Sequence, residues 1–409
     1  MEESTTALVG DTVIIGAGIV GLAVAWQLRG SRRVIVVEKE VAPALHQTGR
    51  NSGVIHSGVY YAPQSSKARM CLDGRTLLER FCRDHRIRIH TCGKLIGAAD
   101  QHEVASLEKL GDRGEAHGIR GLELLDSHAV RHLEPAVAVV SALLVPTTGL
   151  VDFRTVTLAM ARDIQEAGGI ILHSFEVAAV ESHSSRVTVT ARDGRKVSAE
   201  SAVNCAGLYS DRIARLAGAS PSARIIPFKG LYYGVVYSDL VSRPIYPVPD
   251  PAFPFLGVHL TPSIGGTLAA GPNAVLALGR EAYTGRDRNL LETLALVGYP
   301  GFWRMAGRHW RTGLGEIHRT LSRKAFARAI RRMIPTFRDE WLEPAGCGIR
   351  AQAVDRRGKM VDDFSFARSD SFVHVINAPS PAATASLAIA QRIVEMLDGP
   401  TELASVPNG

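Results

Sequence analysis

The chain has 409 residues, of which 46% are hydrophobic and 21% charged, and its formal net charge is +7. At roughly 100–200 residues per domain the length predicts two or three domains, and the ordinary composition excludes a disordered or low-complexity chain. No apolar run approaches the ~18 residues of a membrane span, and the acidic N-terminus does not resemble a signal peptide. Five cysteines without a C-x-x-C pair argue against disulfides or structural zinc, so we expect a cytoplasmic protein without a bound metal.

The N-terminal region predicts a dinucleotide-binding βαβ unit. An apolar strand, the sequence Gly16-x-Gly18-x-x-Gly21, a helix and a second apolar strand that ends at Glu38 follow one another within residues 12–38. The first glycine permits a tight turn, the second lets a pyrophosphate approach the backbone, and the third lets the helix pack on the strand. Glu38 stands where it would accept the hydroxyl groups of a ribose, and the pyrophosphate would lie at the helix N-terminus.

FAD is expected in preference to NAD, because no third alternating β–α unit follows residue 38. Residues 199–213 and 372–397 each predict a strand, a turn of small residues and a helix, with Pro381 in the first turn of the second helix. A cofactor contacted by N-terminal, central and C-terminal segments is long and buried, which favours FAD. We expect no covalent link, because Cys347 is interpreted as a buried, unreactive thiol. The residues expected to contact it are Gly16, Ala17, Gly18, Ile19, Val20, Gly21, Glu38, Lys39, Gly49, Arg50, Asn51, Ser52, Gly53, Ala206, Gly207, Ser380, Pro381, Ala382, Ala383 and Thr384.

No repeat or flexible linker separates the domains, so we expect them to be interleaved. The expected fold class is α/β (α+β), with a Rossmann-like FAD-binding domain interleaved with a mainly antiparallel-sheet substrate domain. The FAD-binding domain is expected to comprise residues 1–95, 145–175, 198–222 and 345–409, and the substrate domain residues 96–144, 176–197 and 223–344.

Ordered motifs along nearly the whole chain resemble one enzyme family. They are His46-Gln-Thr-Gly-Arg-Asn-Ser-Gly-Val-Ile-His-Ser-Gly-Val-Tyr-Tyr61, Cys92-Gly-Lys-Leu-Ile, Asn204-Cys-Ala-Gly-Leu, Pro247-Val-Pro-Asp-Pro, Phe255-Leu-Gly-Val-His-Leu-Thr, Gly348-Ile-Arg-Ala-Gln-Ala-Val and Asn377-Ala-Pro-Ser-Pro-Ala-Ala-Thr. The set is similar to the L-2-hydroxyglutarate dehydrogenase/oxidase family, within the FAD-dependent D-amino-acid-oxidase-like superfamily. The resemblance implies oxidation of L-2-hydroxyglutarate to 2-oxoglutarate by hydride transfer to flavin N5.

One position departs from this family. Where the family usually has Phe-Arg/Lys-Gly-Glu-Tyr, this chain has Phe228-Lys-Gly-Leu231-Tyr. Loss of the acid leaves a second hypothesis open, in which the substrate is another 2-hydroxy acid, an amino acid or a specialised metabolite on the same fold.

Oxidation of an α-hydroxy acid requires a base for the hydroxyl proton, and a histidine suits this role because its pKa lies near working pH. His56 is the first candidate, since it lies between small residues and resembles the Ile-His-Gly-Gly stretch beside the flavin of related glycerol-3-phosphate oxidases. His259 is the second. Arg350 resembles the Gly-x-Arg element that holds the substrate carboxylate in this superfamily, and its planar guanidinium suits a bidentate carboxylate contact.

A second substrate carboxylate requires a second cation, for which Lys229 and Lys359 are the candidates. Tyr60, Tyr232 and Tyr233 are expected to offer hydroxyl contacts to the substrate, although such tyrosines also pack in protein cores.

Residues 301–332 are strongly basic, with nine Lys and Arg residues against the single acid Glu316. The stretch predicts a solvated helical face, a surface that attracts anionic substrates or, with Trp303 and Trp310, a surface that docks on an anionic membrane. Docking would place the protein at the inner membrane, where a quinone could accept its electrons; dioxygen is the alternative acceptor. No recognition motif accompanies the charge, so nucleic acid is not expected as a partner.

Overall fold

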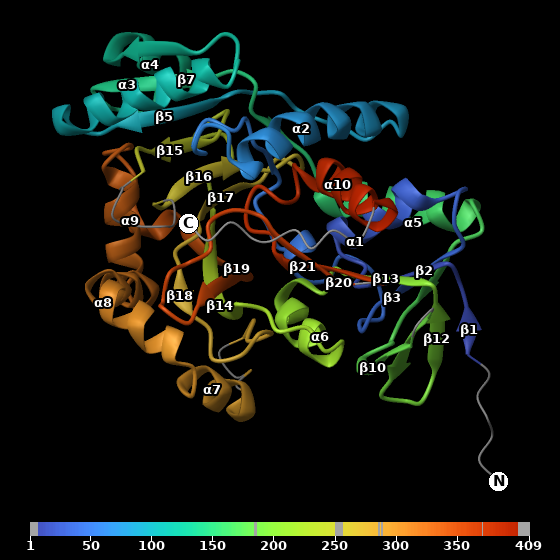
Figure 1. Cartoon of the computed structure of the whole chain (residues 1–409). Helices are drawn as coiled ribbons and strands as arrows, with labels where there is room; N and C mark the ends of the chain where they lie inside the picture. Colours follow the sequence, from blue (N-terminus) through green and yellow to red (C-terminus); the bar gives the residue numbers. More distant parts are fainter. Residues whose placement is uncertain are drawn as a thin grey trace.

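The computed structural model describes residues 7–183, 186–249, 257–284, 287, 289–369 and 371–399. Residues 250, 251, 255 and 256 of the family-like motifs, and the two ends of the expected FAD-binding domain, lie outside this part. Two halves lie side by side, each built around a large sheet of its own (Figure 1).

The first half, which we call the cofactor half, is built on a six-stranded sheet. Its central strands are short runs of β-branched residues that are buried on both faces, as expected for a parallel sheet covered on two sides. All neighbouring strands are parallel except the pair formed by the last two in the chain. In sheet order the strands are β20 (Ser365–Ser369), β21 (Phe372–Asn377), β13 (Ser201–Asn204), β2 (Thr12–Ile15), β3 (Val34–Val37) and β9 (Ile170–Leu172).

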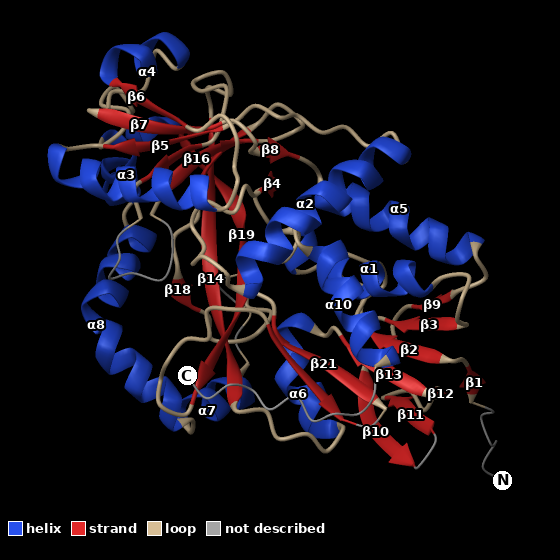
Figure 2. Ribbon diagram, turned by 45° about the horizontal axis from the view of Figure 1, so that its top comes forward, coloured by secondary structure: helices blue, strands red, loops and turns tan. Residues whose placement is uncertain are grey.

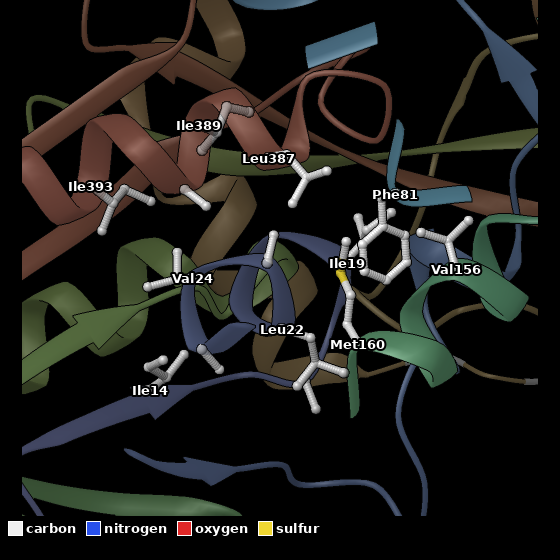
Figure 3. Packing of buried hydrophobic residues seen from close by; sticks show 14 of the residues in the cluster. Ile14, Ile19, Leu22, Val24, Phe81, Val156, Met160, Leu387, Ile389 and Ile393 are labelled. Carbon is white, nitrogen blue, oxygen red and sulfur yellow. The ribbon is translucent and has the colours of Figure 1, made fainter. Parts of the chain in front are cut away.

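Helices cover one face of this sheet. They are α1 (Ile19–Leu28), α2 (Ser66–Asp84), α5 (Phe153–Glu166) and α10 (Ser386–Asp398). Figure 3 shows α1 at the centre of this layer, with Ile389 and Ile393 of α10 above it and Phe81 and Met160 beside Ile19. The helix has apolar residues on all sides because it is enclosed between the sheet and the other helices.

A four-stranded sheet covers the opposite face. It consists of β1 (Leu8–Val9), β12 (Lys196–Ala199), β11 (Arg186–Ala191) and β10 (Val177–His183) in that order. Val187, Val189 and Val197 share one core cluster with Val13 and Ile35 of the six-stranded sheet. Residues 176–197 therefore pack on the cofactor half, in contrast to the expected division, which grouped them with the substrate domain.

The second half, which we call the substrate half, contains a nine-stranded sheet that is antiparallel apart from the pairing of β15 with β5 (Figure 2). Its strands are β5 (Lys94–Ala98), β6 (Glu123–Asp126), β7 (Ser141–Val145), β14 (Ala223–Val235), β15 (Ile245–Pro247), β16 (His259–Pro262), β17 (Leu268–Gly271), β18 (Val275–Leu276) and β19 (Leu342–Asp355). The remaining helices are α3 (Gln101–Ala116), α4 (Ser127–Leu133), α6 (Ser210–Leu216), α7 (Leu290–Val297), α8 (Pro300–Leu321) and α9 (Arg323–Arg331). The expected α/β fold class with a mainly antiparallel second sheet is confirmed.

Two short strands form a separate two-stranded sheet. Strand β4 (Val54–Ile55) pairs with β8 (Gly149–Leu150), and this pair holds the loop that carries His56. One local expectation was wrong: Pro381 does not lie in the first turn of a helix, since residues 380–385 form turns and α10 begins at Ser386.

Candidate active site

A cavity of about 700 Å³ lies between the two halves. This volume is within the range of sites that enclose cofactors and small ligands. Its walls come from segments far apart in the sequence, and most belong to six stretches: residues 18–20, 47–56, 60–67, 205–210, 348–352 and 375–383.

The N-terminus of α1 forms one end of the cavity. Gly16 has a φ of +108°, and a Cβ atom at Gly21 would lie 1.9 Å from the Gly16 carbonyl oxygen, so both positions require glycine. Gly18 is the N-cap and provides no side chain, and Gly18, Ile19 and Val20 line the cavity. The positive end of the helix dipole therefore faces the cavity, which fits a diphosphate group.

Glu38 stabilises the turn beside this helix. Its carboxylate accepts a hydrogen bond from the Ala17 backbone N–H at 2.7 Å and another from the Glu40 N–H at 2.9 Å. Lys39 forms ion pairs with Glu40 and Glu281. Neither Glu38 nor Lys39 lines the cavity, so their contacts with the cofactor stay predictions.

Most of the other residues expected at the cofactor line the cavity: Arg50, Asn51, Ser52, Gly207, Ser380, Pro381, Ala382 and Ala383. Gly49, Gly53, Ala206 and Thr384 lie in the same segments behind this lining. Gln47, Thr48 and Cys205 also line it and were not among the expected residues, although each lies within one of the family-like motifs. The hydroxyl of Thr48 accepts a hydrogen bond from the Ile19 N–H at 3.0 Å, which explains its place at the start of α1.

His56 lies on the cavity wall, where the loop after β4 meets the segment before α10. Its backbone N–H donates to the Thr384 hydroxyl at 3.1 Å, and its Nε2 lies 3.4 Å from the Ser380 Oγ. Burial, together with the positive charges of Lys94, His259, Lys67 and Arg350, lowers the pKa of His56 to about 3. The imidazole is therefore neutral at physiological pH and can accept a proton.

Arg350 reaches the cavity because β19 pairs with β14. Phe228 is opposite Arg350 and Gly230 is opposite Gly348, so Arg350 shares the cavity-facing side of the sheet with the two glycines and with Tyr232. Burial raises the pKa of the Tyr232 hydroxyl, and the neighbouring Arg350 charge opposes that rise. A guanidinium beside a neutral phenol hydroxyl provides the donors that a carboxylate accepts.

The structure does not bring every expected substrate residue to the cavity. Lys229 faces the other side of β14, where its Nζ donates to the Ala282 and Tyr283 carbonyls at 2.9 and 2.7 Å. Tyr233 packs against Phe326 with ring centroids 4.7 Å apart. Lys359 is exposed in the turn that follows β19. The expectation that Lys229, Tyr233 and Lys359 lie at the substrate site is therefore corrected, because none of them lines the cavity.

Two further positions lie near the cavity without lining it. The ring of His259 stacks on Tyr246 at 3.9 Å, and its Nδ1 donates to the Gly257 carbonyl at 2.8 Å. Burial lowers the pKa of His259 to about 3. Leu231, the residue that departs from the family pattern, is absent from the cavity wall, and its N–H donates to the Asn273 side chain at 2.9 Å.

The cavity also has cationic residues that sequence analysis missed. Lys67 at the start of α2 is buried, lines the cavity and forms an ion pair with Asp362 at 2.9 Å. Lys109 and Arg113 of α3 line it as well, while Tyr60 lies on the wall as expected. Lys67 follows the recognised His46–Tyr61 motif by only six residues, but nothing in its local pattern indicates that the helix start turns toward the site.

Comparisons with known proteins agree with this geometry. Residues 11–396 match the family described as FAD dependent oxidoreductase. The chain belongs to this family. It is 41% identical over 403 residues to the L-2-hydroxyglutarate dehydrogenase of Escherichia coli K12, an alignment that covers 97% of this chain and 95% of that protein. It is also 41% identical over 416 residues to the human mitochondrial L-2-hydroxyglutarate dehydrogenase, covering 96% and 89% of the two chains.

Solved structures share the fold at lower sequence identity. The FAD-bound L-α-glycerophosphate oxidase of Mycoplasma pneumoniae superposes with a TM-score of 0.79 at 22% identity, over 98% of this chain and 97% of that one. Glycine oxidase of Geobacillus kaustophilus gives a TM-score of 0.73 at 17% identity over 98% of each chain. FAD is thus the cofactor of this protein, as predicted, and the open helix N-terminus at Gly18 fits its diphosphate.

A negative charge introduced at Gly18 should weaken FAD binding. Gly18→Asp adds a carboxylate at the N-terminus of α1, where it would repel a diphosphate, while Asp is a favourable N-cap and φ at this position is −74°. We expect a loss on the order of tenfold or more in FAD affinity. Fluorescence titration of the apoprotein with FAD measures it. Gly307→Asp, at an open position on α8, is the matched control, and equal affinity of the two variants would contradict the assignment.

Proposed function

We propose that this protein catalyses the FAD-dependent oxidation of L-2-hydroxyglutarate to 2-oxoglutarate. The observation that carries the proposal is the identity of about 41% over nearly the full chain with L-2-hydroxyglutarate dehydrogenases from bacteria and mammals. The cavity adds a physical reason, because it combines a neutral imidazole, a guanidinium and further cations in a partly buried space.

The charge of the cavity suits a dicarboxylate. Asp362 is the one carboxylate among the described residues that line it, and Lys67 already forms an ion pair with that side chain. Arg350 and Lys94 contribute further positive charge near His56. A substrate with two carboxylates neutralises this excess, whereas the ammonium group of an amino acid would add to it.

The residues divide the work as follows. Arg350 binds the carboxylate next to the reacting carbon through two N–H donors, and the Tyr232 hydroxyl donates a hydrogen bond to the same carboxylate. Neutral His56 accepts the proton of the substrate hydroxyl, and the bound dianion stabilises the imidazolium that results. FAD, when bound, supplies the acceptor for the hydrogen and two electrons that leave the carbon. Ser380 and Thr384 hold His56 in place through the contacts described above.

Anaerobic mixing of the purified protein with each enantiomer of 2-hydroxyglutarate tests the proposal. We expect the L isomer, and not the D isomer, to bleach the visible absorbance of the oxidised flavin. Absence of bleaching by either isomer would refute the substrate assignment.

Arg350→Lys should retain FAD but lose about 2–4 kcal/mol in kcat/KM, because an ammonium cannot form the bidentate contact. An unchanged kcat/KM in the variant would remove Arg350 from the substrate site.

The acid limb of kcat should lie at higher pH than that of kcat/KM. Before substrate binds, the pKa of His56 is lowered to about 3, so the base is neutral at every pH above that value. A bound dianion raises the pKa of His56 in the complex, so protonation inhibits turnover at a higher pH. Stopped-flow flavin reduction from about pH 5 to 8 locates the limb of kcat, whereas kcat/KM should show no acid limb from His56 in this range. His56→Ala should keep FAD and reduce it roughly 10²–10⁴ times more slowly. An acid limb in kcat/KM near the ordinary histidine pKa that vanishes in this variant would contradict the lowered value.

We further propose that α7 and α8 dock on an anionic membrane surface, where a quinone accepts the electrons. Apolar side chains on these helices are unusually exposed, with Leu291 78% and Leu321 81% accessible. Trp303, Trp310, Leu314, Ile317 and Leu321 recur at helical spacing along α8. Figure 1 shows α7, α8 and α9 along one edge of the substrate half. Within the described residues, no helix is long and apolar enough to cross a bilayer.

Charge complementarity supports the lipid assignment. Arg304, Arg308 and Arg311 accompany the exposed tryptophans on α8, and Arg323 and Lys324 follow at the start of α9. Basic side chains beside exposed Trp and Leu are typical of helices that lie in a membrane interface.

Vesicle co-sedimentation at low salt tests this surface. The protein should bind vesicles that contain phosphatidylglycerol, release from them at high salt, and bind poorly to pure phosphatidylcholine. Replacing Trp303, Trp310 and Leu314 together by Ser should abolish binding. Substitution of the exposed Val41 and Leu124 by Ser is the matched control, because these residues lie outside α7 and α8. Retention of binding by the triple variant, or no binding of the unmodified protein, would refute the docking surface.

A further inference from the structure

A lysine is fully buried beside the cavity. Lys94, the first residue of β5, has 0% of its surface exposed. Its ammonium lies 4.3 Å from the ring centroid of Tyr60 and 5.0 Å from that of Tyr246. Within the part of the chain that the structure describes, no carboxylate forms an ion pair with it, in contrast to Lys67, which has Asp362.

The side chains around Lys94 share one face of the substrate sheet. Tyr246 on β15 pairs with Ile96, two residues from Lys94, and stacks on His259 of the next strand. The hydroxyl of Tyr60, which covers the ammonium, is buried without a hydrogen-bond partner among the described residues. The local surroundings therefore present donors without a matching acceptor, an arrangement that costs free energy unless a ligand compensates it.

Tyr60 separates Lys94 from the cavity, because it both lines the cavity and covers the ammonium. The titratable groups that face Lys94 are Tyr60, Cys71 of α2, Tyr246 of β15, and the two histidines His56 and His259. None of these is a carboxylate. Burial lowers the pKa of Lys94 to about 7, with a small opposing effect from Cys71, so the charge of this lysine responds to any anion that enters the cavity.

We propose that Lys94 is a positioning residue that makes the site selective for a dicarboxylate, by holding an uncompensated positive charge behind Tyr60 for the second carboxylate of the substrate. The inference rests on the proposed function and assigns the residue that senses the group distinguishing L-2-hydroxyglutarate from a monocarboxylic 2-hydroxy acid. Binding of the diacid favours the protonated form of Lys94, so at a pH above its pKa of about 7 the protein takes up a proton when the diacid binds. The sequence candidates for this role, Lys229 and Lys359, face carbonyl groups and solvent respectively.

Substrate selectivity provides the first test. Lys94→Met should lower kcat/KM for L-2-hydroxyglutarate on the order of 10- to 100-fold, while the value for L-2-hydroxybutyrate changes little. Lys94→Arg, which keeps the charge, should restore most of the preference for the diacid. Lys359→Met is the matched control and should behave as the unmodified protein. A purely structural role for Lys94 would impair both substrates equally, and this outcome would overturn the proposal.

Proton uptake provides the second test and does not depend on turnover. Glutarate, which lacks the hydroxyl group and so cannot be oxidised in the same way, is titrated into the FAD-loaded protein in a calorimeter at about pH 8. The difference in binding enthalpy between two buffers of different ionisation enthalpy gives the number of protons taken up. The unmodified protein and His56→Ala should take up close to one proton per glutarate, whereas Lys94→Met and Lys94→Arg should take up none. Equal uptake by all four proteins would overturn the inference.

The two tests separate this inference from the proposed function. If L-2-hydroxyglutarate fails to reduce the flavin although glutarate binds with Lys94-dependent proton uptake, the substrate assignment is wrong and the role of Lys94 stands. If the flavin is reduced but Lys94→Met retains full preference for the diacid, the inference fails alone. Removal of a buried, unpaired charge is expected to leave the fold intact, which thermal unfolding of the Lys94→Met variant checks.

Discussion

The antiparallel pairing of β14 with β19 is the contact on which the site depends. These two long strands run side by side from Ala223 opposite Asp355 to Val235 opposite Leu342. Their middle passes the cavity, and their far end reaches the cofactor half, where the Ala353 N–H donates to the Asn377 side chain on β21. Arg350 is thereby fixed relative to the strands of the cofactor half by backbone hydrogen bonds, which hold a side chain more rigidly than a loop does.

The pairing of β14 with β19 also determines which charged side chains meet in the cavity. Two sheets and a helix end converge on a space where positive side chains outnumber acids; burial and these charges keep His56 neutral, and burial lowers the pKa of Lys94 to about 7. In the reaction that we propose, a bound dianion favours the protonated form of both groups. The positive charge that attracts the substrate then also keeps His56 neutral until the substrate arrives, which couples binding to chemistry.

The sequence was sufficient for the fold class, for FAD and for the placing of His56 and Arg350 beside one cavity, because glycine spacing and family-like motifs are local features. The sequence did not predict that Lys229 and Tyr233 point away from the cavity. Their exclusion depends on which face of β14 each side chain takes, and this strand contains a register shift between Leu231 and Tyr233 that no periodicity reveals. Lys94 was missed for a related reason, since the rings that cover its ammonium come from Tyr60 in an earlier loop and from Tyr246 on β15, and no local pattern brings these segments together.

The order of strands in the cofactor half has a consequence for biosynthesis. Strands β2 and β3 leave the ribosome early, but β13, which pairs with β2, and β21, which pairs with β13, begin only at Ser201 and Phe372. At typical translation rates of 5–20 residues per second, roughly 20–70 s pass between synthesis of the N-terminal βαβ unit and that of the last parallel strand of its sheet. During that interval the apolar faces of β2, β3 and α1 are incompletely covered, and the cover is completed only when α10, which packs on α1, has been made.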